Sequence, residues 1–378
     1  MSLEDTTVKL NRFSTLAGAL VAGSLALTAC GGSSSGTSDA GSSGSSSGGA
    51  ASLSGTLNGA GSTAQQAAMQ AWATKFQETN SDVTVNYDPV GSGGGREQFL
   101  AGGATSFAGS DAALTDEELA KAKTRCSNTD AMDLPVYVSP IAVAYNLPDV
   151  SNLQLSADTI AKIFAGKITK WDDAAIKADN PDAKLPSTDI TTVHRSDDSG
   201  TTQNFTDYLS KAAPSSWTYP PAQTWPVKGG EAAEGTSGVI AAIKAGEGSV
   251  GYADHSQVGD LGSVALKVGS AYVPPSAEAA AKVAELSTPT AGRPAGDLSI
   301  DVARDTTEAG AYPLILISYQ IVCQTYDKAS DAALVKAFET YVVSAEGQDA
   351  AAQAAGSAPL SDALRTKVEA SIAMIKGA

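Results

Sequence analysis

Histidine is scarce in this chain: among 378 residues there are two, His194 and His255, and cysteine occurs three times. After residue 52 no serine stands in the nucleophile pattern G-x-S-x-G, and the phosphate loop G-x-x-x-x-G-K-[ST] is absent. Few side chains are therefore available as metal ligands or general bases. The composition argues against a hydrolase or a histidine-bound metal centre, and we expect structural or surface roles for both histidines.

Positive charge is also in short supply. Lysine and arginine total 25 against 41 aspartates and glutamates, which leaves a net charge of −16 at pH 7. Nucleic acids and anionic membrane surfaces need a cationic protein face, so neither is an expected partner. A small anionic ligand is compatible with this balance, because charges beyond about 10 Å are screened and a site responds to its immediate neighbours.

A transmembrane helix is not expected near the N-terminus, because the apolar run 13–27 is short for a bilayer. Lys9 and Arg12 precede this run, as in an export signal. The run ends in L-T-A-C, with Cys30 last, which resembles the lipobox of bacterial lipoproteins. We interpret residues 1–29 as a lipoprotein signal peptide and Cys30 as a lipidated anchor. An ordinary secretory signal with an incidental cysteine is the alternative.

The segment after Cys30 lacks the large apolar side chains that form a hydrophobic core. Residues 31–50 contain nine serines and seven glycines, a composition that buries too little apolar surface to fold. We interpret residues 30–52 as the lipidated cysteine followed by a flexible tether, whose ends lie about 25 Å apart on average. Such a tether leaves a folded domain free to turn near a membrane.

The other two cysteines, Cys126 and Cys323, lie in the part of the chain expected to fold. In an exported protein the oxidising surroundings make such a pair a disulfide candidate. On the chain-entropy model a bridge over so long a loop would stabilise the fold by roughly 5 kcal/mol, before any strain is subtracted. Two separate buried thiols are the alternative.

The folded part alternates helical and strand patterns. Apolar residues make up 42% of the chain and charged residues 17%, as in a well-packed globule long enough for two domains. Apolar residues have helical spacing over 69–76 and strand spacing over 83–87, which predicts an α/β fold. The apolar runs 134–147 and 312–323 are expected as buried strands. Further helices are predicted around residues 160–164, 274–296, 334–341 and 361–375, the last with Ser361 as N-cap.

Three turns rich in glycine, serine and threonine carry hydrogen-bond donors. The segments G-A-G-S-T (59–63) and H-R-S-D-D-S-G-T-T (194–202) directly precede predicted helices, and V-G-S-G-G-G (90–95) has similar chemistry. Unpaired N–H groups at a helix N-terminus bind anions, assisted by hydroxyls and by an arginine such as Arg195. If the three converge, they form a cage for a small tetrahedral anion. Taken singly, each is more typical of a helix cap or a tight turn.

These turns, together with G-S-D at 109–111 and G-K-I-T-K-W-D-D at 166–173, resemble a known family. It comprises the phosphate-binding lipoproteins of the bacterial high-affinity phosphate ABC transporter, and the match covers essentially everything after the tether. The resemblance implies a two-lobed type II periplasmic-binding-protein fold. Each lobe would be a central, mostly parallel sheet flanked by helices, with phosphate in the cleft between the lobes.

The lobe boundaries also follow from the resemblance. Residues 53–139 and 314–378 would form lobe one, and residues 140–313 would form an inserted lobe two. Cys126 and Cys323 would then both belong to lobe one, which favours the disulfide.

Position by position, the resemblance assigns phosphate contacts to both lobes. In lobe one Thr63 would donate through its hydroxyl and amide, Ala64 through its amide, and Ser92 through both groups. In lobe two Arg195 would supply the positive charge, oriented by Asp197. The remaining donors of lobe two would be the hydroxyls and amides of Ser199, Gly200 and Thr201. No metal ion and no cofactor is expected.

Asp111 would decide which anion binds. A carboxylate repels an anion unless the anion brings a proton that the carboxylate can accept. Phosphate near neutral pH keeps at least one proton and sulfate has none, so the sequence predicts a preference for phosphate. A helix cap at Asp111 is the alternative, but Thr115 is better placed for that role.

Two residues depart from the family's common pattern, which has an aromatic residue at the position of Ala64 and a glycine at the position of Asp198. Ala64 keeps its amide and would cover the ligand less. Asp198 would bring negative charge near the anion and lower the affinity unless it points outward. Neither change alters the expected ligand.

The implied function is that of an extracytoplasmic substrate-binding protein. It would capture inorganic phosphate by closing its lobes and deliver it to the permease of an ABC importer, without catalysis. We expect a monomer that is held at the cell membrane only by its lipid, at the cell surface or in the periplasm. A phosphate-ester hydrolase and a surface adhesion or signalling protein on the same fold are the alternatives.

Overall fold

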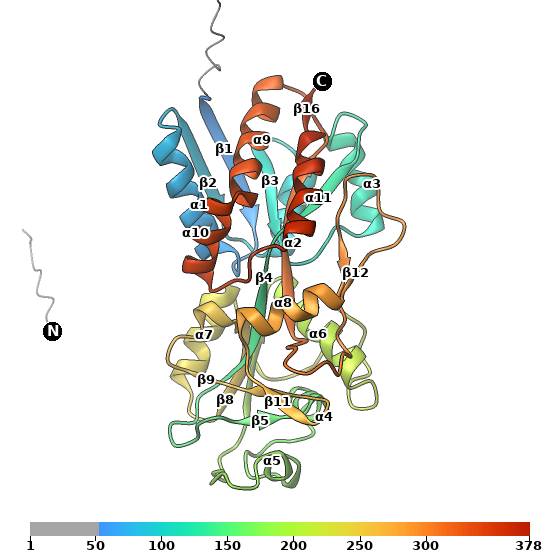
Figure 1. Ribbon diagram of the computed structural model, residues 1–378. Helices are drawn as coiled ribbons and strands as arrows, with labels where there is room; N and C mark the ends of the chain where they lie inside the picture. The colour runs from blue at the N-terminus through green and yellow to red at the C-terminus, as the bar shows by residue number, and fades with distance from the viewer. Residues whose placement is uncertain (1–52) are drawn as a thin grey trace, which may run out of the picture. The chain divides into compact units, whose positions relative to one another are not determined.

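Residues 53–378 are described in a computed structural model of the protein, and they form a two-lobed α/β structure (Figure 1). The expected signal peptide (1–29) and the tether with Cys30 lie outside the described residues. One long strand, β4 (Ala131–Tyr145), passes through both lobes. Every residue of this strand is buried, so β4 joins the cores of the two lobes.

Strands and helices alternate along most of the chain, as the sequence predicts. The other strands are β1 (Gly55–Gly61), β2 (Val83–Asp88), β3 (Thr105–Ser110), β5 (Gln154–Leu155), β6 (Thr191–Arg195), β7 (Glu231–Ala233), β8 (Ser249–Asp254), β9 (Gly262–Ser263), β10 (Ala265–Val268), β11 (Ala271–Val273), β12 (Thr288–Pro289), β13 (Ile300–Asp301), β14 (Ile315–Cys323), β15 (Thr325–Tyr326) and β16 (Lys376–Gly377). The helices are α1 (Gln66–Thr79), α2 (Ser92–Ala101), α3 (Asp116–Arg125), α4 (Ala157–Phe164), α5 (Ala174–Asp179), α6 (Gly200–Ala212), α7 (Gly235–Ala245), α8 (Ala277–Leu286), α9 (Ala329–Val343), α10 (Ala345–Ala355) and α11 (Asp362–Ala373), with a 3₁₀ turn at His255–Gln257.

A single mixed sheet connects the two lobes. Its strands lie in the order β2-β1-β3-β14-β4-β8-β6-β7, and β9 pairs with β4 beside this path. The outer strands pair in parallel, β1 with β2 and β3, and β6 with β7 and β8. The central strands β14, β4 and β8 pair antiparallel. Because β4 hydrogen-bonds to strands of both lobes, the expected two sheets are continuous with each other.

The partners of β4 change in the middle of the strand. Residues 131–140 pair with β14, whereas residues 141–145 pair with β8. The expected lobe boundary at residue 139 lies next to this change. We call the part around β1–β3 and β14 lobe one, and the part around β6–β8 lobe two.

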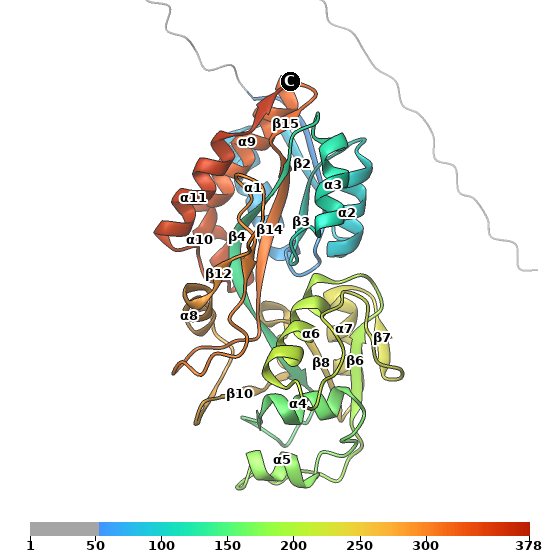
Figure 2. The same ribbon diagram turned by 90° about the vertical axis from the view of Figure 1, so that its right-hand side faces the viewer.

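Helices cover both faces of the lobe-one sheet. Figure 2 shows α9, α10 and α11 on one face and α2 and α3 on the other. In the core of lobe one, Phe76 packs edge-on against Phe338, with ring centroids 5.3 Å apart. In lobe two, Phe205 stacks on Tyr252 at 4.4 Å and Phe164 packs against Phe205 at 4.8 Å. Burial of such rings provides much of the stability of each lobe.

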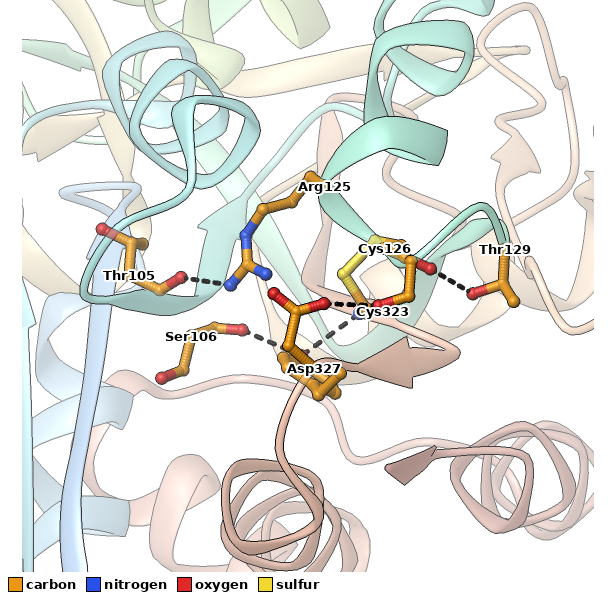
Figure 3. The surroundings of a disulfide bond; sticks show 9 residues. Thr105, Ser106, Arg125, Cys126, Thr129, Cys323 and Asp327 are labelled. Atoms are coloured by element: carbon orange, nitrogen blue, oxygen red, sulfur yellow. Dashed lines mark hydrogen bonds between the residues drawn. A yellow bond between two sulfur atoms is a disulfide. The ribbon is translucent and has the colours of Figure 1, made fainter. Parts of the chain in front are cut away.

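A disulfide joins Cys126, directly after α3, to Cys323, the last residue of β14 (Figure 3). The two Cα atoms lie 5.1 Å apart. Around it, Thr129 Oγ1 donates to the carbonyl of Cys126, and Arg125 donates to the carbonyl of Thr105. The disulfide therefore fastens a surface helix of lobe one to a central strand.

Local sequence signals fix several helix starts. Thr115 begins α3 with a capping box completed by Glu118, and Ser361 caps α11 by accepting from the amide of Leu364, as predicted. The C-terminal helix is shorter than predicted, because it ends at Ala373 and the chain then forms β16 beside β15. Among residues 53–378, none of the helices is both long enough and apolar enough to span a membrane.

Candidate anion-binding site

The predicted site residues lie at strand ends and helix starts. Asp111 directly follows β3, and Arg195 is the last residue of β6. Ser92 is the first residue of α2, and Ser199 is the N-cap of α6. Of the others, Thr63 and Ala64 lie between β1 and α1, and Gly200 and Thr201 begin α6. Lobe one and lobe two thus each present a helix start with unpaired amides.

Asp111 is a buried carboxylate held by two hydroxyls. Ser62 Oγ donates to Asp111 Oδ2 at 2.5 Å, and Ser318 Oγ donates to Asp111 Oδ1 at 2.9 Å. Burial raises the pKa of Asp111, and the two hydroxyls and the charge of Arg195 oppose this rise. Each carboxylate oxygen has a second lone-pair direction, so Asp111 can still accept a proton donor from a ligand.

An amide network fixes the direction of the Ser318 hydroxyl. Gln65 Nε2 donates to Ser318 Oγ at 2.8 Å, so the hydroxyl hydrogen is directed to Asp111. Gln320 Nε2 in turn donates to Gln65 Oε1 at 3.0 Å. All of these side chains are buried. The carboxylate is therefore positioned by a chain of fixed donors that starts in β14.

Arg195 is buried and paired with Asp197. Its Nε donates to Asp197 Oδ1 at 2.7 Å, and Nη2 donates to Asp197 Oδ2. Burial raises the pKa of Asp197, but the ion pair with Arg195 outweighs this and holds the pKa below its usual value. The amide of Gly235 also donates to Asp197 Oδ1, at 3.1 Å. Asp197 thus orients the guanidinium, whose other N–H groups can face a ligand.

The start of α6 lies directly against lobe one. A methyl group on Gly200 would come 2.6 Å from Ser92 Oγ and 2.9 Å from Asp111 Cβ. Only glycine allows so close an approach here, although its backbone angles are ordinary. The hydroxyl of Thr201 is buried close to Asp111, where it helps to lower the pKa of that carboxyl, and it has no hydrogen bond of good geometry among the described residues. A buried hydroxyl of this kind is a donor that a ligand oxygen can satisfy.

The hydroxyl of Thr63 connects the two lobes. It accepts from the amide of Thr236, the second residue of α7, at 3.1 Å, and it lies 2.9 Å from the hydroxyl of Thr236. The amide of Ala64 is paired locally with Ser62 Oγ at 3.1 Å. Ala64 is completely buried, so solvent is excluded there without an aromatic side chain.

Asp198 points outward. Its side chain is exposed, and Oδ1 accepts from the hydroxyl of Thr224 at 2.7 Å. Its backbone instead faces lobe one, because its carbonyl accepts from the amide of Gly93 at 3.0 Å. The carboxylate of Asp198 is therefore exposed and bonded to Thr224, and among the described residues it makes no hydrogen bond to Arg195 or Asp111.

Sequence reasoning missed three residues of this region: Ser62, Thr236 and Ser318. Thr236 stands in E-G-T-S-G at the start of an apolar helix, and this combination of glycine and hydroxyl residues is also found in the three donor turns. Ser62 lies inside one of those turns. Ser318 gave no signal, since it stands in an apolar strand and acts only through residues distant in sequence.

The two histidines are engaged elsewhere. His194 stacks on Trp225, with ring centroids 5.2 Å apart and planes 12° apart. His255 is half-buried in a 3₁₀ turn, and burial lowers its pKa. Within residues 53–378 no group of three histidine, cysteine or acidic side chains could hold a metal ion.

Fold and site together define a class, the two-lobed periplasmic-type binding proteins that hold a small ligand between lobes. A family model described as a PBP superfamily domain matches residues 46–346. The chain is 37% identical over 342 residues to the phosphate-binding protein PstS 3 of Mycobacterium tuberculosis, covering 88% of this chain and 90% of that protein. It is 32% identical over 296 residues to the phosphate-binding protein PstS of Xylella fastidiosa, covering 75% and 76%. The chain belongs to the PstS family of phosphate-binding proteins.

Solved structures show the same fold. A high-affinity periplasmic phosphate-binding protein bound with phosphate matches with a TM-score of 0.69 at 23% identity, over 84% of this chain and 93% of that chain. A phosphate-binding protein from Stenotrophomonas maltophilia matches with a TM-score of 0.64 at 20% identity, over 84% and 94%. At these identities the likeness concerns the fold alone.

Proposed function

We propose that this protein captures inorganic phosphate outside the cytoplasm and delivers it to the permease of an ABC importer. The observation that carries the proposal is the pairing of a buried acceptor, Asp111, with a buried cation, Arg195, where the starts of α6 and α7 meet lobe one. Cation and helix N-termini attract an anion, and the carboxylate requires that the anion bring a proton. Phosphate meets both conditions, and membership of the PstS family supports it.

Arg195 and the amides of Gly200 and Thr201 would hold the phosphate from lobe two. Thr63 and Ser92 would hold it from lobe one. The amide of Thr236 donates to Thr63 Oγ1, and with the Thr236 hydroxyl also donating to this oxygen, the Thr63 hydroxyl hydrogen would be available to an anion. Closing the lobes would thus complete the donor set and exclude water in one movement.

No step in this function changes the ligand. A phosphoryl-transfer enzyme needs a nucleophile with a base beside it, whereas Ser199 Oγ caps α6 by accepting from the amide of Thr202 at 3.2 Å. We propose a binding protein and not an enzyme. Hydrolysis of a chromogenic phosphate ester that is abolished by Ser199→Ala would contradict this.

We also propose that Cys30 carries a lipid and that the protein acts as a tethered monomer at the cell surface or in the periplasm. The lipobox-like L-T-A-C and the Gly/Ser-rich segment after it support this proposal. Metabolic labelling with a fatty acid, lost in Cys30→Ala, is the test. Unlabelled wild-type protein would contradict it.

Calorimetric titration with phosphate, arsenate and sulfate tests the proposed function. We expect the purified protein to bind phosphate and arsenate and to leave sulfate unbound. Asp111→Asn is expected to reduce the preference for phosphate over sulfate by at least about tenfold, because the amide can donate to sulfate. Asp198→Asn is the matched control, since its carboxylate faces outward, and it should behave like the wild type. Failure of the wild type to bind phosphate would overturn the proposal.

A further inference from the structure

Asn204, in the second turn of α6, bridges the two lobes without being one of the expected ligand contacts. Its Nδ2 donates to the backbone carbonyl of Asp111 in lobe one at 2.7 Å. The same nitrogen donates to the carbonyl of Gly200 in its own helix at 2.9 Å. The side chain thus ties the start of α6 to the backbone of the residue that supplies the acceptor carboxylate.

Every polar atom of the Asn204 side chain is engaged in protein hydrogen bonds. Both N–H groups of Nδ2 have the acceptors just described, and Oδ1 accepts from Nη2 of Arg304. No donor is left for an anion. An effect of Asn204 on binding would therefore act through the position of the lobes.

Arg304 fixes which way the Asn204 amide points. A guanidinium only donates, so it selects the oxygen of the amide and directs the nitrogen to Asp111. Arg304 is itself held at the point where the chain returns to lobe one, since its Nη1 donates to the carbonyls of Pro313 at 3.2 Å and Ile315 at 2.6 Å.

Its Nε completes the anchoring by donating to Asp207 of α6 at 3.0 Å. Arg304 is buried, with 2% of its surface exposed. It therefore holds the returning strand and the two acceptor positions on α6 in one rigid cluster.

We propose that Asn204 is a positioning residue that keeps the lobes closed, and that Arg304 sets its orientation. The contact between Asn204 and Asp111 can exist only while α6 lies against lobe one, so its free energy belongs to the closed state alone. A contact made only after closure slows opening and leaves the encounter with the ligand unaffected. This inference rests on the proposed function, because it names what retains the phosphate after capture.

Stopped-flow measurement of phosphate binding and release tests the inference. Asn204→Ala is expected to raise the dissociation rate about tenfold and to leave the association rate nearly unchanged, as for loss of one buried neutral hydrogen bond. A pocket of about 460 Å³ beside Asn204 and Arg304 lets water reach the carbonyl left behind, which limits the effect.

Asn204→Asp separates positioning from a merely structural role. The aspartate would keep its bond to Arg304 as an ion pair, so the protein should remain folded, with a melting temperature lowered by repulsion between the second carboxylate oxygen and the carbonyls of Asp111 and Gly200. It would place an oxygen against the carbonyl of Asp111, and release should be faster than in Asn204→Ala. The ratio of phosphate to arsenate affinity should stay at the wild-type value in both variants, because Asn204 touches neither ligand.

Asn180→Ala is the matched control. Asn180 is a buried asparagine of lobe two whose side chain bonds to Gln154 and Ile176 within that lobe. This variant should lower the melting temperature and leave the dissociation rate unchanged. Wild-type dissociation rates in both Asn204 variants would overturn the inference and leave the proposed function intact. A wild-type protein that binds no phosphate would overturn the proposed function and this inference with it.

Discussion

The two lobes contribute opposite kinds of chemistry to one site. Lobe one supplies a carboxylate, Asp111, that is held by the hydroxyls of Ser62 and Ser318. Lobe two supplies a guanidinium, Arg195, together with the start of α6. Under the proposed function this difference means a division of roles, in which lobe two would attract an anion and lobe one would select an anion that carries a proton. Neither lobe alone could do both.

The lobes also differ in how they are stabilised. Lobe one carries the disulfide between Cys126 and Cys323. Both lobes contain packed aromatic rings, around Phe76 and Phe338 in lobe one and around Phe205 and Tyr252 in lobe two, but among the described residues the disulfide belongs to lobe one alone. One buried carboxylate from each lobe shows a further contrast: Asp179 in lobe two accepts from Ser156, Thr159 and Tyr272, whereas Glu339 in lobe one has no partner among the described residues.

Removing the cation should affect binding most. Arg195→Met deletes the cation of lobe two and leaves the partly buried Asp197 with only the amide of Gly235 as a partner, so both changes oppose anion binding. We expect phosphate affinity to fall about 10³-fold, equivalent to about 4 kcal/mol, in calorimetric titration. Arg365→Met, at a half-buried position of α11 where the arginine pairs with Asp362, is the control and should bind normally. An Arg195→Met protein with near-normal affinity would refute the assigned role of lobe two.

Removing the disulfide tests whether it stabilises lobe one without contributing to the site. The double variant Cys126→Ser with Cys323→Ser is expected to lower the free energy of unfolding by about 3 kcal/mol in urea. Phosphate affinity should stay within about twofold, because the disulfide joins α3 to the far end of β14 and holds none of the site loops. A large loss of affinity with unchanged stability would show that the disulfide supports the site and does not stabilise lobe one.

Gly200→Ala keeps the hydrogen-bond donors of lobe two but should prevent α6 from lying against lobe one. The amide remains, but the added methyl would lie 2.6 Å from Ser92 Oγ. We expect phosphate affinity to fall about 30-fold, within the usual cost of overpacking a closed interface. Gly238→Ala in α7, where the nearest atom is 3.7 Å away, is the matched control. Equal affinities for both variants would show that close approach of α6 is unnecessary.

The smallest effect concerns the unpartnered carboxylate of lobe one. Burial raises the pKa of Glu339 from its ordinary 4.5 to about 8. Between these values the folded protein keeps a proton that the unfolded chain has lost, so stability is complete below about pH 4.5 and falls as the pH rises towards 8. Glu339→Gln should remove this dependence and raise the free energy of unfolding at pH 8 by about 2 kcal/mol.

Urea unfolding at pH 5 and pH 8 measures the difference. The control is Glu369→Gln on the exposed surface of α11, which should leave the wild-type pH dependence in place. If Glu339→Gln and the wild type lose the same stability between the two pH values, then Glu339 is not the group that titrates.

Features of the fold and the site could be predicted from the sequence where the interacting residues are close neighbours along the chain. Thr115 and Ser361 cap their helices through groups three residues away, and the donor turns at 59–63 and 194–202 adjoin their helices. The pairing of Thr63 with Thr236 spans 173 residues, and no sequence pattern indicates that these two residues meet. The same holds for Ser318, whose polarity in a buried strand is explained by its partners Asp111 and Gln65, both distant in sequence.

The direction in which a side chain points could not be predicted from the sequence either. Asp198 follows Asp197 immediately, yet one carboxylate holds Arg195 and the other faces solvent beside Thr224. Composition cannot distinguish them, because the difference comes from how the chain turns between β6 and α6. The order of strands in the sheet was likewise fixed by pairings between distant segments, such as β14 between β3 and β4.

Strand β4 couples the unfolding of the two lobes. If lobe two melted alone, residues 141–145 would lose their partner β8 while residues 131–140 stayed paired with β14. The broken strand would expose unpaired backbone groups in the middle of the molecule, which is unfavourable and invites association with other chains. The protein is therefore expected to populate fully folded and fully unfolded forms, and half-melted forms that could aggregate should be rare.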